Sequence, residues 1–130
     1  MWRYIWSAPE PQKIGYVFKL EHSYDMRKRE AERLLIKHSN KVPLIVEKSN
    51  NNNLQTLENN KFLIERHVTI GKLLYLIRSK INLKASESIY LFVNNDIVPA
   101  TGQTIGEVYD MYKDDDKFLY VTYSPENSFG

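Results

Sequence analysis

The chain contains no cysteine, and this absence removes several kinds of protein from consideration. Without cysteine there is no disulfide bond, no thiol nucleophile and no zinc site built on thiolates. No apolar run approaches the roughly 18 residues of a membrane span, and we expect no secretory signal peptide. The 130 residues predict a single globular domain that is large enough to bury a core.

The chain also has little excess charge and no catalytic motif. The formal net charge is +2 at pH 7, which does not by itself indicate a nucleic-acid partner. His22, His38 and His67 match no metal-ligand spacing, and there is no glycine-rich phosphate loop or nucleophilic serine elbow. Asp110 and the run 114–116 are typical of a solvated turn. We therefore expect a protein that is not an enzyme, with no metal, no cofactor and no nucleic-acid partner.

Residues 1–13 differ from the rest of the chain. Trp2, Tyr4, Ile5 and Trp6 lie within five residues of one another, and a proline-containing spacer at 8–11 follows them. This pattern indicates an arm outside the core, stiffened by its prolines. A disordered tail is the simplest interpretation, but two tryptophans on an exposed arm favour docking on some surface.

Two helices are predicted from apolar spacing. Residues 24–38 carry a buried stripe of Ala31, Leu34, Leu35 and His38, and the charged face at 27–33 is expected to be solvated. Thr69 caps a second helix at 70–80. Its core stripe is Ile70, Leu74, Ile77 and Ile81, with Leu73 and Leu76 to one side. This surplus of apolar residues packs under a loop or lines a groove.

Four strands and a short helix complete the predicted α+β fold. The strands are expected at 42–48, 61–66, 89–93 and 118–123, and a capping box at 104–107 opens a helix that ends near Tyr112. The first two strands form an antiparallel hairpin around a polar, asparagine-rich loop at 49–60 that we expect to make no packing contacts. Both faces of the last strand are apolar, so it is expected at the centre of the sheet. This element order is that of a β-grasp domain with a helix added in front.

The polar residues 124–128 are expected to leave the sheet and to lead to Gly130. A central strand followed by a short tail with a terminal glycine suits a ubiquitin-like modifier, because a residue without Cβ can thread a narrow enzyme channel. A frayed terminus that happens to end in glycine is the alternative.

Several ordered segments resemble the autophagy-related ubiquitin-like modifiers known as the GABARAP-like proteins. The segments are 18–22, 27–30, 42–48, 61–64, 69–71, 77–78, 92–95 and 118–130, so the resemblance covers residues 16–130. It implies a ubiquitin-like domain at 14–123 with two additional N-terminal helices, and a flexible conjugation tail at 124–130. It also implies that Gly130 is linked to phosphatidylethanolamine by an activating and a conjugating enzyme and is released by a cysteine protease. The protein would then be cytoplasmic, and bound to the autophagosome membrane when lipidated.

The resemblance further implies a binding site for cargo receptors that carry an aromatic-x-x-aliphatic motif. Such a peptide would add as a strand beside residues 61–63. The residues implied for the aromatic pocket are Glu30, Leu34, Pro43, Ile45, Lys61, Leu63 and Phe118. Those implied for the aliphatic pocket are Phe62, Ile64, Leu73 and Leu76.

The chain departs from the family pattern at Glu65, at Pro125, in the asparagine-rich loop and in the arm. Trp2-Arg3-Tyr4-Ile5 itself has the aromatic-x-x-aliphatic spacing, so the arm could dock in this groove through Trp2 and Ile5, in cis or in trans. The main alternative function is an unconjugated ubiquitin-like interaction module, such as a trafficking or cytoskeletal adaptor. A more distant one is a cytoskeletal or nucleic-acid binder that uses the basic residues of 28–33 and would show steep salt dependence.

Overall fold

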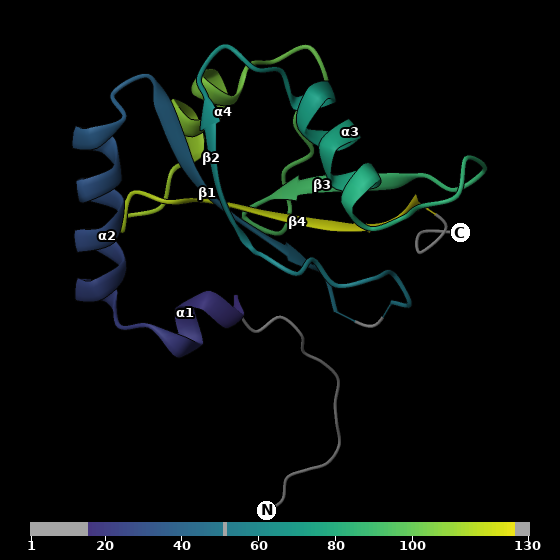
Figure 1. The fold of residues 1–130 in the computed structure, drawn as a ribbon, viewed down its shortest axis with the longest axis horizontal. Helices are drawn as coiled ribbons and strands as arrows, with labels where there is room; N and C mark the ends of the chain where they lie inside the picture. Colours follow the sequence, from purple (N-terminus) through teal and green to yellow (C-terminus); the bar gives the residue numbers. More distant parts are fainter. Residues whose placement is uncertain (1–15, 51, 127–130) are drawn as a thin grey trace, which may run out of the picture.

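The structure, a computed structural model, describes residues 16–50 and 52–126. The arm at 1–13 and Gly130 lie outside these residues. Within these residues the chain forms four helices and four strands, and the α+β class is as predicted (Figure 1). In chain order they are α1 (Val17–Glu21), α2 (Tyr24–Lys37), β1 (Lys41–Lys48), β2 (Lys61–Glu65), α3 (Ile70–Lys80), β3 (Ile89–Val93), α4 (Ile105–Tyr112) and β4 (Leu119–Pro125).

The four strands form one mixed sheet in the order β2-β1-β4-β3. β1 pairs antiparallel with β2 and parallel with β4, and β3 pairs antiparallel with β4. The central position predicted for the last strand is confirmed. The strand is longer than predicted, however, because Ser124 and Pro125, expected in the tail, pair with Tyr90 and Ile89 of β3.

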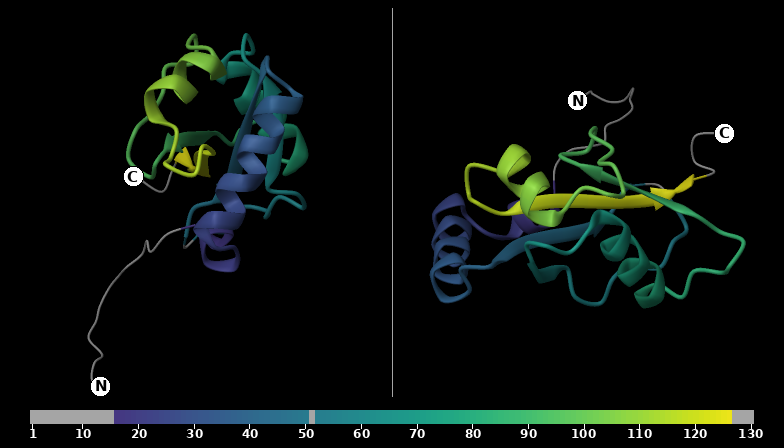
Figure 2. Two further views of the ribbon diagram at one scale, coloured as in Figure 1. Left: turned by 90° about the vertical axis from the view of Figure 1, so that its left-hand side faces the viewer. Right: turned by 90° about the horizontal axis from the view of Figure 1, so that it is seen from above.

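The two faces of the sheet are covered by different helices (Figures 1 and 2). Alternation along β1 sends Val42, Leu44 and Val46 to the face that packs against α3 and α4. Ile45 lies on the opposite face, in a smaller core that α1 and α2 cover. The members of this smaller core are Tyr16, Phe18, Ala31, Ile45, Phe118 and Tyr120, with Leu34 packed against them.

The predicted helix starts are confirmed by their caps. The Thr69 side chain accepts a hydrogen bond from the Lys72 amide, and Thr104 and Glu107 form the capping box. The stripe predicted for α3 needs one correction, since Leu73 is 1% exposed and belongs to the core, while Leu74 is only partly buried.

The asparagine-rich loop packs against the domain, contrary to expectation. Leu57 is buried in the larger core and Leu54 packs against it. The Tyr123 hydroxyl donates a hydrogen bond of 2.7 Å to the carbonyl of Gln55 and accepts one of 3.1 Å from the Leu57 amide. Leu54 and Leu57 of the loop and Tyr123 of the central strand thus hold this mostly polar loop against the domain.

Among the described residues, no helix has the length and apolar character required to cross a bilayer.

Candidate functional site

β2 forms one edge of the sheet and presents its outer backbone groups to an added strand. The Arg66 amide donates to the Asn40 carbonyl and the Val46 amide to the Asn60 carbonyl, each at 2.9 Å. In an antiparallel pair the hydrogen-bonded and non-hydrogen-bonded positions alternate, so the N–H and C=O of Leu63 point away from β1. The same alternation places Pro43 opposite Leu63, where the missing N–H of proline costs no hydrogen bond to β2.

The residues implied for the aromatic pocket lie on the face of the sheet that α1 and α2 cover. Ile45 and Phe118 are fully buried and Pro43 is buried, so these three can form only the floor of a pocket. Leu34 and Leu63 are half-buried and can form its walls. Lys61 is exposed, and Glu30 is half-buried and pairs with Arg33.

The residues implied for the aliphatic pocket lie on the opposite face of the sheet. Phe62, Ile64 and Leu76 are half-buried, while Leu73 is buried beneath them and can act only as support. A groove of about 710 Å³ runs along the outer edge of β2. Its lining residues are Gln55, Thr56, Leu57, Glu58, Asn59, Lys61, Phe62, Leu63, Ile64, Leu76 and Lys80.

The loop contributes groove residues that the sequence analysis did not anticipate. Residues 55–59 form one wall, and the Asn59 side-chain carbonyl accepts a hydrogen bond of 3.1 Å from the Lys61 amide. A polar loop has no periodicity from which these contacts could be predicted. The one available signal was the pair of leucines at 54 and 57, which is unusual in a solvated loop.

α1 is held against the sheet beside the start of β2. The Glu47 carboxylate accepts hydrogen bonds of 2.9 Å from the backbone amides of both Val17 and Phe18. The Phe18 ring packs edge-on against Phe118 at 5.2 Å, and the Lys61 ammonium lies 5.7 Å from the centre of the Phe18 ring. The basic rim of the groove therefore touches the first helix.

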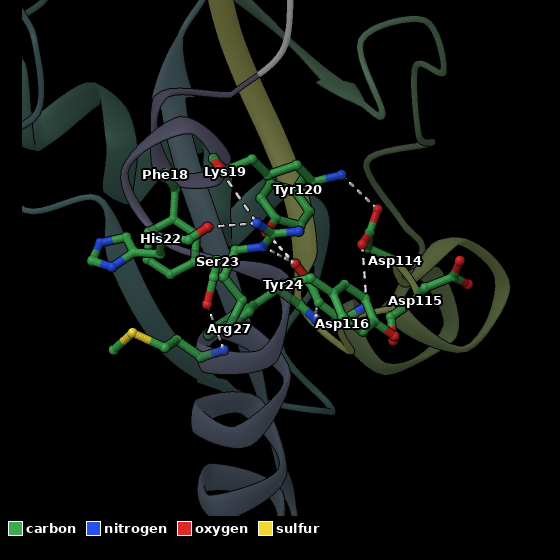
Figure 3. Close-up of polar contacts among 12 residues, drawn as sticks. Phe18, Lys19, His22, Ser23, Tyr24, Arg27, Asp114, Asp115, Asp116 and Tyr120 are labelled. Atoms are coloured by element: carbon green, nitrogen blue, oxygen red, sulfur yellow. Dashed lines mark hydrogen bonds and ion pairs between the residues drawn. The ribbon is translucent and has the colours of Figure 1, made fainter.

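The prediction that residues 27–33 form a solvated face is wrong at its first residue. Arg27 is buried, and its Nε lies 2.8 Å from Oδ2 of Asp116, which is fully buried (Figure 3). The Tyr120 hydroxyl donates to the same carboxylate oxygen at 2.5 Å. Burial alone would lower the pKa of Arg27, but the hydrogen bond and charge of Asp116 raise it. Burial is the largest cause that raises the pKa of Tyr120, and the hydrogen bond to Asp116 raises it further.

The acidic run at 114–116, predicted as a solvated turn, is therefore only partly solvated. Besides Asp116, Asp114 is half-buried and accepts a hydrogen bond of 2.8 Å from the Lys19 ammonium (Figure 3). Burial is the largest single influence on Asp114 and opposes its ionisation. The hydrogen bonds from Lys19 and from the Asp116 amide, together with the charge of Lys19, outweigh burial and lower the pKa of this carboxyl group. Lys19 and Arg27 together fasten α1 and α2 to the turn that precedes β4.

The remaining charges on α2 behave as predicted. Arg33 pairs with Glu30 on the same helix at 3.1 Å, and Lys117 pairs with Glu32 at 3.0 Å. These pairs are largely exposed and contribute little to stability. Across residues 16–50 and 52–126, no group of three or more histidine, aspartate or glutamate side chains could hold a metal ion.

Comparisons with known proteins agree with this architecture. Residues 26–130 match the family described as "Autophagy protein Atg8 ubiquitin like". Autophagy-related protein 8e of Arabidopsis thaliana is 40% identical over 116 residues, which are 89% of this chain and 94% of that protein. Autophagy-related protein 8 of Mycosarcoma maydis is 41% identical over 113 residues, which are 87% of this chain and 95% of that protein.

Solved structures show the same fold. Trypanosoma brucei ATG8 superposes with a TM-score of 0.81 at 29% identity, covering 87% of this chain and 97% of that one. Plasmodium falciparum Atg8, solved in complex with a P. falciparum Atg3 peptide, has a TM-score of 0.77 at 34% identity and covers 85% and 96%. With two additional N-terminal helices on a ubiquitin-like β-sheet and about 40% identity to curated relatives over most of its length, the chain belongs to the Atg8 family of ubiquitin-like autophagy proteins.

Proposed function

We propose that this protein acts as a modifier rather than an enzyme, conjugated through Gly130 to phosphatidylethanolamine. In that state it recruits cargo receptors whose aromatic-x-x-aliphatic motifs add as a strand to β2. Its partners in conjugation are an activating and a conjugating enzyme, and a cysteine protease reverses the step. It is cytoplasmic before conjugation and lies on the autophagosome membrane afterwards.

The observation that carries the proposal is the arrangement of β2. Leu63 and Phe62 are adjacent, so their side chains point to opposite faces of the sheet, toward α2 and toward α3 respectively. A peptide strand beside them also sends alternate side chains to the two faces. It can therefore bury an aromatic residue on one side and an aliphatic residue on the other.

The family comparison supports a peptide partner of this pathway. The related Plasmodium falciparum Atg8 was solved with an Atg3 peptide. By analogy, the same type of surface on this chain would serve both a pathway enzyme and cargo receptors, and these two kinds of partner would then compete.

Replacing Leu63 with alanine tests the site. The change removes apolar surface from the pocket without altering the backbone of β2, and we expect a loss of about 1–3 kcal/mol in binding of an acidic Trp-x-x-Leu peptide. Calorimetry or fluorescence anisotropy measures the affinity. The matched control is Ile36→Ala, because Ile36 is 85% exposed and lies about 200° around α2 from Leu34. Equal affinity of the wild type and Leu63→Ala would remove this site from the proposal.

A further inference from the structure

The sequence contains an apolar arm, and the structure shows where that arm joins the domain. Residues 1–13 carry Trp2, Ile5 and Trp6, and the described chain begins at Tyr16. Tyr16 is buried, with its ring centre 4.7 Å from that of Tyr120. The attachment point of the arm is therefore a well-packed position of the domain.

This attachment point lies beside the groove at β2. The Lys61 ammonium at the groove rim is 5.7 Å from the ring of Phe18, two residues after Tyr16. A second cavity of about 430 Å³ is lined by Val17 and by loop residues 56–58, and those three loop residues also line the groove. One hollowed surface thus leads from the start of α1 to the outer edge of β2.

We propose that Trp2 and Ile5 dock in this groove in cis, so that the arm acts as an internal competitor of cargo motifs. The inference rests on the proposed function of the groove and adds its regulation. Trp2 and Ile5 have the aromatic-x-x-aliphatic spacing of the expected ligand.

The length of the arm is sufficient for docking in cis. Ten residues separate Ile5 from Tyr16. As a flexible chain they have a mean end-to-end distance of about 16–19 Å, and fully extended with their prolines they reach about 31 Å. The five residues of β2 span roughly 17 Å, starting beside α1. The extended length exceeds that of β2, so docking in cis does not require a second molecule.

The charges of the groove predict weak intrinsic binding. Lys61 and Lys80 repel Arg3 of the arm, whereas Glu58 attracts it, and Glu58 forms no ion pair with the described residues. A short tether gives an effective concentration on the order of millimolar. A motif with an intrinsic Kd between about 0.1 and 1 mM would then weaken cargo binding by about 2- to 10-fold. A cargo motif that binds the groove more tightly than the arm displaces the arm, whereas a motif that binds more weakly than the arm is excluded.

The test measures the affinity of a fluorescent acidic Trp-x-x-Leu peptide for the full chain and for the double variant W2A/I5A. We expect the variant to bind about 2- to 10-fold more tightly. Trp6→Ala is the matched control, because it removes an equally large ring from the same arm but outside the four-residue motif. If W2A/I5A binds no more tightly than the wild type, or if Trp6→Ala has the same effect, the proposal is overturned.

Two further observations separate the remaining outcomes. Docking in cis is independent of protein concentration, so an effect that grows with concentration shows binding to a second copy and contradicts the cis arrangement. A peptide that binds none of the variants contradicts the proposed function of the groove. In that case the amide NMR chemical shifts of Lys61 and Leu63 test whether the arm docks. If the arm occupies the groove, these shifts differ from the wild-type values in W2A/I5A and equal them in Trp6→Ala.

Discussion

Arg27 Nε lies 2.8 Å from Asp116 Oδ2. This ion pair joins the second helix, α2, to the turn before the central strand, β4. The two residues are 89 positions apart in sequence, and both side chains are buried. The carboxylate also accepts the Tyr120 hydroxyl and, through Oδ1, the Phe118 amide at 2.9 Å. The guanidinium in turn donates to the His22 carbonyl at 2.7 Å. This network fixes α1 and α2 on the sheet.

Replacing Asp116 with alanine should destabilise the protein by about 3–5 kcal/mol, because Arg27 would remain buried without its partner. Urea unfolding followed by circular dichroism measures the change. Asp115→Ala is the control, since that side chain is exposed and makes no ion pair with the described residues. We expect an effect within about 0.5 kcal/mol there. If the two variants are equally stable, the ion pair does not hold the helices.

High pH should unfold the protein through its buried tyrosines. Among the described residues, burial is the main cause that raises the pKa of four tyrosines, Tyr16, Tyr109, Tyr120 and Tyr123. Above about pH 10 the unfolded chain loses these protons while the folded chain keeps them. The stability they contribute is complete below that pH and is lost as the pH rises further.

Tyrosinate absorbance and circular dichroism, recorded in one alkaline titration, test this prediction. A group of tyrosines should ionise only together with unfolding. Tyr16→Phe removes one of these groups, so the number of protons released on unfolding at high pH should fall by one. Ionisation of all nine tyrosines while the chain stays folded would contradict it.

Tyr123→Phe should loosen the asparagine-rich loop. The change leaves the Leu57 amide and the Gln55 carbonyl without their shared hydroxyl, at a cost of about 1–3 kcal/mol. Hydrogen exchange at the Leu57 amide should become faster. Tyr75→Phe, on an exposed position of α3, should leave both stability and exchange unchanged. Unchanged protection of Leu57 in Tyr123→Phe would show that packing alone holds the loop.

Gly130 should be the conjugated residue. Incubation with the activating and conjugating enzymes, ATP and phosphatidylethanolamine liposomes should give a phospholipid adduct on Gly130, detected by mass spectrometry. Gly130→Ala should abolish the adduct, because a Cβ obstructs a narrow enzyme channel. If the chain stays unmodified while the same enzymes modify another family member, it is an unconjugated interaction module instead.

The regular elements other than α1 could be predicted from local patterns in the sequence, whereas a second N-terminal helix was implied only by the family resemblance. β3 and α3 have the predicted bounds, and the capping box at Thr104 opens α4 as expected. Apolar periodicity and capping side chains act over a few residues, so their effect can be read without knowledge of the fold. The antiparallel hairpin of β1 and β2 with a free outer edge was also predicted from the residues, and the family resemblance implied that β2 is the edge strand.

The environment of individual polar residues could not be predicted in this way. Arg27 and Lys28 are neighbours in one charged segment, yet only Arg27 is buried. In the acidic turn, Asp116 is buried while its neighbour Asp115 is exposed. Burial of a charge depends on a partner that is distant in sequence and on what covers the pair, and neither has a local pattern. The helices and strands were therefore encoded in short segments, whereas the buried ion pair and the packing of the loop arose only when the chain closed on itself.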